Sequence, residues 1–220
     1  MEEALNELKL WLETKRSRLI DYRIRIGNVV FHIPFDGSKY LLFKCARCGS
    51  CCRGQRYLCL LLTYGDMKRL SRYMKYPSIE AFLKRECVLA EVNERDVYPI
   101  IGAPPVKASY IGYFLKRFKD ENEETITKPH KCRFLTDRNL CSIYDARPMV
   151  CRKFPYTVIW DGELLHAYYV VTPWLKCMGY RAKPKIKRSW LSPYVKHLTQ
   201  SFEETIETVS KGLMVITDVT

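Results

Sequence analysis

One short segment, Cys45-Ala-Arg-Cys48-Gly-Ser-Cys51-Cys52, constrains this chain more than any other, because it places four thiols within eight residues. Cys45, Cys48 and Cys51 are separated by a regular gap of two residues. This spacing lets a short backbone segment wrap one metal centre with several sulfur atoms, as in structural zinc knuckles and ferredoxin-type iron–sulfur sites. Thiolates are soft anionic ligands that suit both zinc and iron–sulfur clusters. The segment therefore predicts a metal site.

A second set of thiols follows about eighty residues later and consists of Cys132, Cys141, Cys151 and Cys177. We expect the two sets to meet in space and to hold metal together. Three thiols at a repeated two-residue gap favour a [4Fe–4S] cluster over zinc, since zinc sites usually combine one Cys pair from each of two segments. The eight thiols divide into two four-thiolate centres or form one larger polynuclear site, and the spacing leaves both arrangements open.

Neighbouring thiols such as Cys51 and Cys52 point in different directions and seldom share one metal. If the segment is helical, Cys45, Cys48 and Cys52 lie on one face instead. In either case one thiol of the Cys51-Cys52 pair is expected to face another site.

The remaining cysteines and the histidines are predicted to be structural. Cys59 lies within an apolar run and Cys87 near the end of an amphipathic helix, so both are expected to pack in the core. His130 lies two residues before Cys132, where it is either a substitute for a thiol or an exposed loop residue. The other histidines occur in strand or helix patterns: His32, His166 and His197.

Four arginines lie next to thiols in the sequence: Arg47, Arg53, Arg133 and Arg152. A cluster of thiolates carries excess negative charge, which nearby guanidinium groups and backbone N–H donors would offset. The alternative is that these are ordinary surface arginines.

The whole chain is basic, with a formal net charge of +13 over 220 residues. Nucleic acid, an acidic protein or a membrane surface would suit this charge as a partner, whereas the spread of the basic residues also suits a merely soluble surface. We expect no membrane insertion, because the apolar runs are far shorter than a spanning helix. The sequence shows no secretory signal pattern, which predicts a cytoplasmic protein with reduced thiols. The cysteines would be expected to form disulfides, and not to bind metal, only if the protein came from a hyperthermophile, where intracellular proteins can be oxidised.

The apolar patterns predict an α+β fold, in which a small metal-stapled domain of short strands and hairpins has flanking N- and C-terminal helices. We expect a single domain over residues 1–220, with a metal-binding core over 45–179 and flanking elements over 1–44 and 180–220. Helices are predicted over 3–18, 64–75 with Thr63 as cap, 79–87 with Ser78 as cap, a short helix after Arg147-Pro148, and 192–211. Strands are predicted over 22–33 with a turn at 34–38, over 40–44, after an irregular stretch within 97–118, and as a hairpin over 156–171; 181–188 is a basic linker.

The thiols fall within longer blocks. These blocks are Cys45-x-x-Cys48-Gly49-x-Cys51-Cys52, Cys132-x-Phe134-Leu135, Cys141-Ser142-Ile143-Tyr144, Arg147-Pro148-x-x-Cys151-Arg152-x-Phe154-Pro155 and Cys177-x-Gly179. Their order resembles the CxxCxxCC cysteine-cluster family, also called the YkgJ-like or zinc- or iron-chelating domain family, which includes the flagellin lysine N-methylase. The helix start Thr63-x-x-Asp66 is also similar. The resemblance implies eight metal-binding cysteines, which are those of the two sets.

Three functions remain open at this point. The first is a metal-cluster protein with a structural or redox-active centre, and the second, by analogy with the methylase, is a protein lysine methyltransferase that uses S-adenosylmethionine. The chain lacks a Gly-x-Gly-x-x-Gly loop and the Cys-x₃-Cys-x₂-Cys pattern of radical enzymes, which weighs against the enzyme. The third is a nucleic-acid-binding module with structural zinc, which would use the positive charge and exposed aromatics such as Tyr110 and Tyr113.

Replacement of Cys48 by Ala tests the metal assignment. We expect Cys48→Ala to lose metal and to lower the melting temperature, because clustered thiolates without metal cannot organise this region of the chain. Metal analysis and thermal unfolding measure both effects. Full metal content with an unchanged melting temperature would rule out Cys48 as a ligand.

Overall fold

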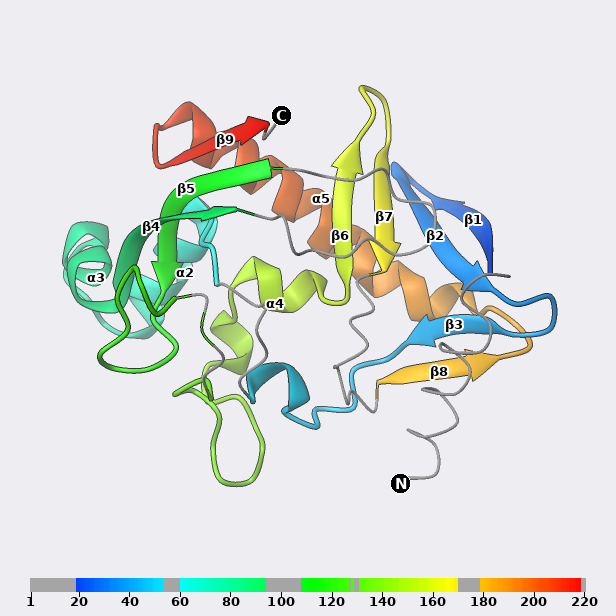
Figure 1. The fold of residues 1–220 in the computed structure, drawn as a ribbon, viewed down its shortest axis with the longest axis horizontal. Helices are drawn as coiled ribbons and strands as arrows, with labels where there is room; N and C mark the ends of the chain where they lie inside the picture. The colour runs from blue at the N-terminus through cyan, green and yellow to red at the C-terminus, as the bar shows by residue number, and fades with distance from the viewer. Residues whose placement is uncertain are drawn as a thin grey trace.

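In the part of the chain that the structure describes, the larger of two β-sheets has six strands, which come from residues 20–43 and 156–183 (Figure 1). Its order is β6-β7-β2-β3-β8, with β1 paired to β2. Strands β2 and β7 run parallel, and the other neighbours run antiparallel. The strands are β1 (Ile20–Ile26), β2 (Val29–Phe35), β3 (Tyr40–Phe43), β6 (Tyr156–Trp160), β7 (Leu165–Tyr169) and β8 (Tyr180–Lys183). The computed structural model describes residues 19–53, 60–93, 108–126, 128, 131–169 and 179–218.

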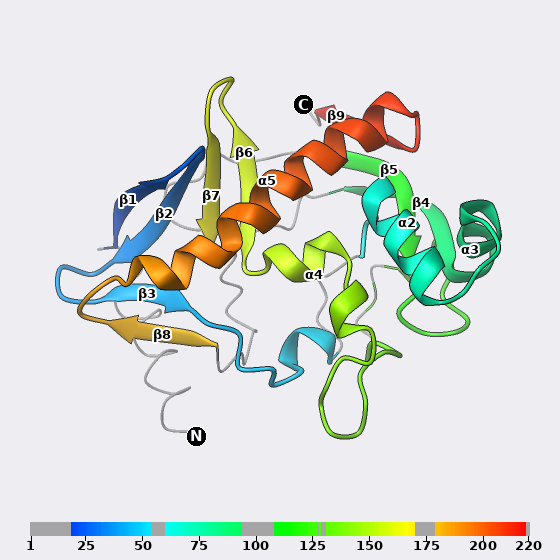
Figure 2. The same cartoon turned by 180° about the vertical axis from the view of Figure 1, so that it is seen from behind.

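The second sheet has three antiparallel strands in the order β4-β5-β9, namely β4 (Cys87–Asn93), β5 (Ala108–Leu115) and β9 (Met214–Asp218). The long helix α5 (Arg188–Ser210) runs from the six-stranded sheet to the three-stranded one, as the view from behind shows (Figure 2). The shorter helices are α2 (Tyr64–Tyr73), α3 (Ile79–Glu86) and α4 (Met149–Lys153), with 3₁₀ turns η2 (Ser50–Cys52) and η4 (Tyr144–Ala146). The predicted α+β class is therefore confirmed.

Two large apolar cores lie beneath these elements, and a small third cluster contains Ala90, Phe114 and Ile126. The first joins the six-stranded sheet to the N-terminal half of α5, where Leu191 and Leu198 pack against Phe31, Leu41 and Tyr169. Strand β2 is buried along almost its whole length, as expected for a central strand that is covered on both faces. The second core lies between α2, α3 and the three-stranded sheet, around Leu62, Met67 and Phe82.

The predicted helix starts at Thr63 and Ser78 are confirmed. Thr63 accepts a hydrogen bond from the backbone N–H of Asp66, and the Asp66 carboxylate accepts one from the backbone N–H of Thr63. This reciprocal capping box satisfies donors that the first turn of a helix would otherwise leave unpaired. Ser78 caps α3 by accepting from the backbone N–H of Ala81. Strand 40–44, the short helix after Arg147-Pro148 and the 156–171 hairpin are also present, as β3, α4 and β6-β7.

Several predicted boundaries are wrong. The single strand expected over 22–33 is a hairpin of β1 and β2, because Gly27 adopts a left-handed φ of 62° and Gly27-Asn28 forms a two-residue turn. Cys87, expected near the end of a helix, directly follows α3 as its C-cap and is also the first residue of β4. The stretch expected as a linker contains β8, and α5 starts at Arg188 with Pro193 near its beginning. Strand β9 was not predicted. The helix expected over 3–18 and the irregular stretch over 97–107 lie outside the described residues.

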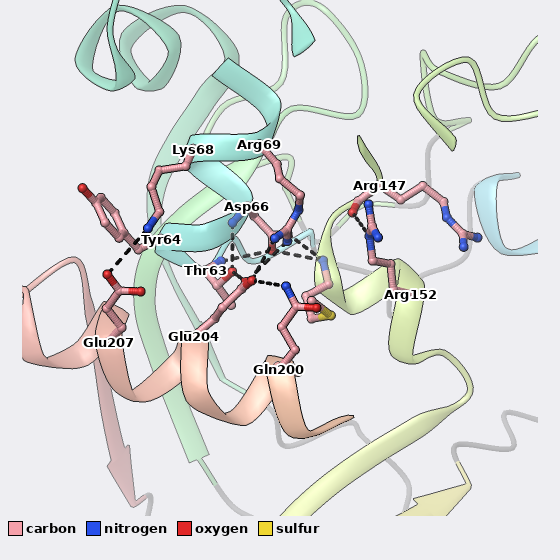
Figure 3. Close-up of polar contacts among 12 residues, drawn as sticks. Thr63, Tyr64, Asp66, Lys68, Arg69, Arg147, Arg152, Gln200, Glu204 and Glu207 are labelled. Atoms are coloured by element: carbon pink, nitrogen blue, oxygen red, sulfur yellow. Dashed lines mark hydrogen bonds and ion pairs between the residues drawn. The ribbon is translucent and has the colours of Figure 1, made fainter. Parts of the chain in front are cut away.

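A buried carboxylate links the helices around the centre of the molecule. Both oxygens of Asp66, which is fully buried, accept hydrogen bonds from the backbone N–H of Met149 at the start of α4, at 2.9 and 3.1 Å. Arg69 donates to Asp66 and, through its other terminal nitrogen, to Glu204 Oε1 on α5 at 2.8 Å. Figure 3 shows this network between α2, α4 and α5. Gly65 allows the close approach, because a Cβ there would lie 2.2 Å from the Glu204 carboxyl carbon.

Substitution of Asp66 by Asn tests the importance of this network. One carboxylate oxygen would become an amide N–H₂ that faces backbone and guanidinium donors, so at least one buried donor would lose its acceptor. We expect the free energy of unfolding to fall by about 1–3 kcal/mol, measured by denaturant titration. Asp120→Asn, at an exposed position, is the matched control and should leave stability unchanged. Equal stability of the two variants would contradict a structural role for Asp66.

Candidate metal centre

Seven of the eight predicted thiols line one cavity of about 820 Å³ between the two sheets and α5. They come from both predicted sets, so the expected meeting of the two sets is observed for the described cysteines. Cys45 is exposed at the rim, and the others are partly buried. The eighth, Cys177, lies outside the described residues, as do Cys59 and His130. The thiols of the cavity are Cys45, Cys48, Cys51, Cys52, Cys132, Cys141 and Cys151.

The first thiol segment leaves the six-stranded sheet at the end of β3. The backbone N–H of Lys44, just before the first thiol, donates to the carbonyl of Gly179 at 2.9 Å. The chain then turns at Gly49, whose φ is 71°. A Cβ at Gly49 would lie only 3.0 Å from Leu135 Cδ1 and 3.2 Å from the carbonyl oxygen of Asn139. Glycine therefore serves two needs here, the left-handed turn and the close approach of the second thiol set.

A direct backbone contact joins the two thiol sets. The N–H of Cys132 donates to the carbonyl of Cys52 at 2.7 Å, next to an isolated β-bridge between Arg53 and Lys131. Further along, a bridge between Leu135 and Cys141 closes the predicted tight turn over 136–139 and returns the chain to the cavity. Two segments that lie far apart in the sequence thus become one continuous wall.

The α4 helix brings the last described thiol to the same cavity. Cys151 lies within α4, whose first residue, Met149, is held by Asp66. The position of this thiol therefore depends on the buried carboxylate of α2 as well as on local helix formation.

The protein environment controls the protonation of these thiols. Cys51 and Cys52 form a sulfur–sulfur hydrogen bond of 3.8 Å, which lowers the pKa of Cys51 and raises that of Cys52, since the pair holds one proton preferentially. Burial raises the pKa of Cys132, Cys141 and Cys151. Thiols that are neutral and buried in this way become thiolates when a metal cation displaces their protons.

The donor chemistry fits a soft metal, because all the cavity's cysteine sulfurs are of the type that zinc and iron–sulfur clusters bind. Backbone N–H groups also point at sulfur, as that of Arg47 does toward Cys45 Sγ at 3.4 Å. In the described part of the chain, no three His, Cys, Asp or Glu side chains form a group that could hold one ion. The sulfurs of Cys51, Cys52, Cys132, Cys141 and Cys151 lie close enough that charge on one raises the pKa of another. The cavity encloses more volume than one ion needs.

Two of the four predicted arginines, Arg47 and Arg152, line this cavity. The other two have protein partners. Arg133 forms an ion pair with Glu86, and Arg53 donates to the side chain of Asn139. Arg133 nevertheless acts on a thiol, because its charge lowers the pKa of Cys132 against the larger effect of burial. That these arginines offset the charge of metal-bound thiolates stays a prediction.

Sequence reasoning missed four basic residues that line the cavity: Lys44, Arg117, Arg147 and His197. Arg147 stands in the Arg147-Pro148 block, which was a usable signal. His197 had no such signal, because it reaches the cavity only through the packing of α5. It was predicted to be structural, and its Nδ1 is buried without a hydrogen-bond partner among the described residues.

The other structural predictions for cysteine and histidine agree with the described contacts. Cys87 is buried in the second apolar core, away from the cavity, and burial raises its pKa to about 12. His32 and His166 hydrogen-bond to each other at 2.8 Å, and each also contacts an aspartate, Asp21 and Asp161 respectively, at 2.8 Å. This chain of contacts ties β1, β2 and β7 together.

Comparison with known families identifies part of this region. Residues 101–193 match the CxxCxxCC family model, described as a putative zinc- or iron-chelating domain. The match confirms the family resemblance. It includes Cys132, Cys141, Cys151 and Cys177, whereas the Cys45–Cys52 segment precedes it and is connected to the CxxCxxCC region through the cavity. The match covers less than half of the chain, and no curated protein or solved structure matches it.

The described helices include none with the length and apolar character required to span a membrane. The longest of them, α5, carries buried polar groups such as Glu204 and Thr208 on the face that packs against α2.

A pair of cysteine variants tests whether metal is bound by the cavity thiols and not by the core thiol Cys87. We expect Cys151→Ala to lower the metal-to-protein ratio, because it removes a sulfur from the cavity wall. Cys87→Ala should keep the full ratio while lowering the free energy of unfolding by about 1 kcal/mol, the usual scale for a core truncation. Elemental analysis and denaturant unfolding of both proteins provide the comparison. Loss of metal in Cys87→Ala, with retention in Cys151→Ala, would reverse the assignment.

Proposed function

We propose that this chain is a metal-chelating protein whose eight cysteines hold an iron–sulfur cluster, [4Fe–4S] in the first instance, with zinc as the alternative. The ligands are the seven cavity thiols together with Cys177. The observation that carries the proposal is the convergence of both thiol sets on one cavity. The regular spacing of Cys45, Cys48 and Cys51 and the number of sulfurs that line one large cavity both favour a polynuclear centre over a single ion.

The metal would act as a staple of the fold. The seven cavity thiols belong to three segments, which are the Cys45–Cys52 turn, the 132–141 loop and α4. An ion or cluster bound by all three would contribute folding free energy, because the unfolded chain has no preformed site. A bound iron–sulfur cluster would also supply one-electron redox chemistry. The cytoplasm, where thiols stay reduced, is the compartment that suits such a site.

The protein's own groups would balance the charge of the thiolates. Arg147 lies close enough to act on Cys51, Cys141 and Cys151, and it lowers the pKa of each against the effect of burial. Backbone N–H groups that point at the sulfurs add to this effect. Such groups tune the reduction potential of a cluster or the affinity for zinc.

An S-adenosylmethionine-dependent methyltransferase is a second candidate, because the cavity has the size of a small-molecule site, roughly 300–1,000 Å³. Calorimetry with S-adenosylmethionine and the metal-loaded protein tests it, and absence of binding would remove it. The nucleic-acid hypothesis loses one of its supports, since Tyr110 and Tyr113 are half-buried in β5, with Tyr113 packed against the second core.

Metal analysis with an absorption spectrum, on protein purified without oxygen, tests the main proposal. Iron and sulfide at about four per chain, with visible absorption that dithionite bleaches, are expected for a [4Fe–4S] centre. A colourless protein that contains zinc would instead support the alternative, a structural zinc site that holds the thiol segments together. Protein that stays free of both metals, and takes up neither on reconstitution while remaining folded, would refute metal chelation.

A further inference from the structure

The part of the cavity wall formed by η4, α4 and α5 is positively charged. Arg147, Arg152 and His197 lie there, and among the described residues that line the cavity Asp145 is the only acidic one. Figure 3 shows the Arg147 side chain pointing away from the carboxylates of Asp66 and Glu204, which are already occupied by Arg69. The Arg147 guanidinium is therefore available to a ligand in the cavity.

Two buried nitrogens of this wall have no partner within the described residues: Nε of Arg147 and Nδ1 of His197. Leaving a buried polar group unpaired costs about 1–3 kcal/mol. Arg147 forms no ion pair with any carboxylate in the described part of the chain, and its guanidinium lies over the ring of Tyr144 at 3.9 Å. By contrast, Arg117, on another part of the wall, is satisfied by Glu121 and by the carbonyls of Ile126 and Lys128. A ligand oxygen would satisfy the unpaired nitrogens.

The positively charged part of the wall includes more than the residue that acts on the thiols. Arg147 acts on the thiols. The pKa of His197 is lowered first by burial and then by the charges of Arg152, Arg147, Lys196 and Arg69. Arg152 donates hydrogen bonds from Nε to the carbonyl of Arg147 and from Nη2 to the carbonyl of Asp145. These bonds hold its positive charge next to Arg147. Arg147 and Arg152 both carry a positive charge, and an anion bound beside them would offset their mutual repulsion.

The remaining space suits an organic molecule. The cavity of about 820 Å³ lies within the range of small-molecule sites, roughly 300–1,000 Å³. Aromatic side chains line it next to the cations, namely Phe43, Phe154, Trp190 and Tyr194. Convergent cationic donors beside an aromatic surface are the features that hold the charged end and the apolar body of one ligand.

We propose that Arg147, Arg152 and His197 bind the oxyanion group, a carboxylate or phosphate, of a small organic molecule held beside the thiol centre. The two guanidinium groups supply charge-assisted hydrogen bonds, and His197 supplies a ring nitrogen. The aromatic residues contact the body of the ligand. This site goes beyond metal chelation and rests on the cations and the cavity, so it stands whether the thiols hold iron–sulfur or zinc.

Isothermal titration of the full-length, metal-loaded protein in phosphate-free buffer tests the site. The probes are benzoate and inorganic phosphate, with benzamide as the neutral match for benzoate. We expect at least one of the two anions to bind and benzamide to bind at least tenfold more weakly than benzoate wherever benzoate binds. Arg147→Gln should weaken anion binding by about tenfold or more, the scale of one charge-assisted hydrogen bond. Arg147→Lys should keep part of the affinity, and Arg72→Gln, on α2 outside the cavity, should bind like the wild type.

Metal content is measured on every variant, so that this proposal and metal chelation are judged separately. Unchanged metal in Arg147→Gln with weakened anion binding supports the site. Binding of neither anion by the wild-type protein, or equal binding by Arg147→Gln, overturns it. Loss of metal in Arg147→Gln also overturns it, because Arg147 would then serve the thiolates alone. A protein without metal that still binds the anions through Arg147 would refute chelation and uphold the anion site.

Discussion

The buried carboxylate of Asp66 is the contact on which the arrangement of the helices depends. It completes the capping box of α2 with Thr63, accepts both hydrogen bonds from Met149 at the start of α4, and pairs with Arg69, which in turn holds Glu204 on α5. Burial raises the pKa of Asp66, while Arg69 and the backbone donors oppose this effect. Such a buried charge is tolerated only when every donor around it is aligned, so it specifies one packing of the three helices.

The thiol-lined cavity is a consequence of that packing. Helix α4 carries Cys151 to the wall, and the backbone hydrogen bond from Cys132 to Cys52 joins the two thiol sets there. Gly49 permits the two thiol segments to touch, because a side chain there would meet Leu135 and the backbone of Asn139. The protein thus brings together sulfurs that are costly to ionise when buried, and a metal cation is the group that relieves this cost.

Two chemically different kinds of residue line the cavity. The first kind is the cysteines, and the second is Arg147, Arg152 and His197 together with aromatic residues such as Trp190. A site that only clamps a structural metal needs the cysteines alone. The basic and aromatic residues give the cavity the charge and lining of a small-molecule site, which connects the proposed centre to a ligand held next to it.

Local spacing was enough to predict much of this protein. The gaps between the thiols indicated a metal site and a family, and the caps at Thr63 and Ser78 and the turn at 161–162 predicted α2, α3 and the β6-β7 hairpin, because these features depend on residues close together in the chain. Long-range pairing was decided only by the tertiary structure. Strand β9 exists because its residues pair with β5, and His197 reaches the cavity because α5 packs against α4. Contacts of this kind join residues that lie far apart in the chain, so the local sequence around one residue does not indicate which residue it will contact.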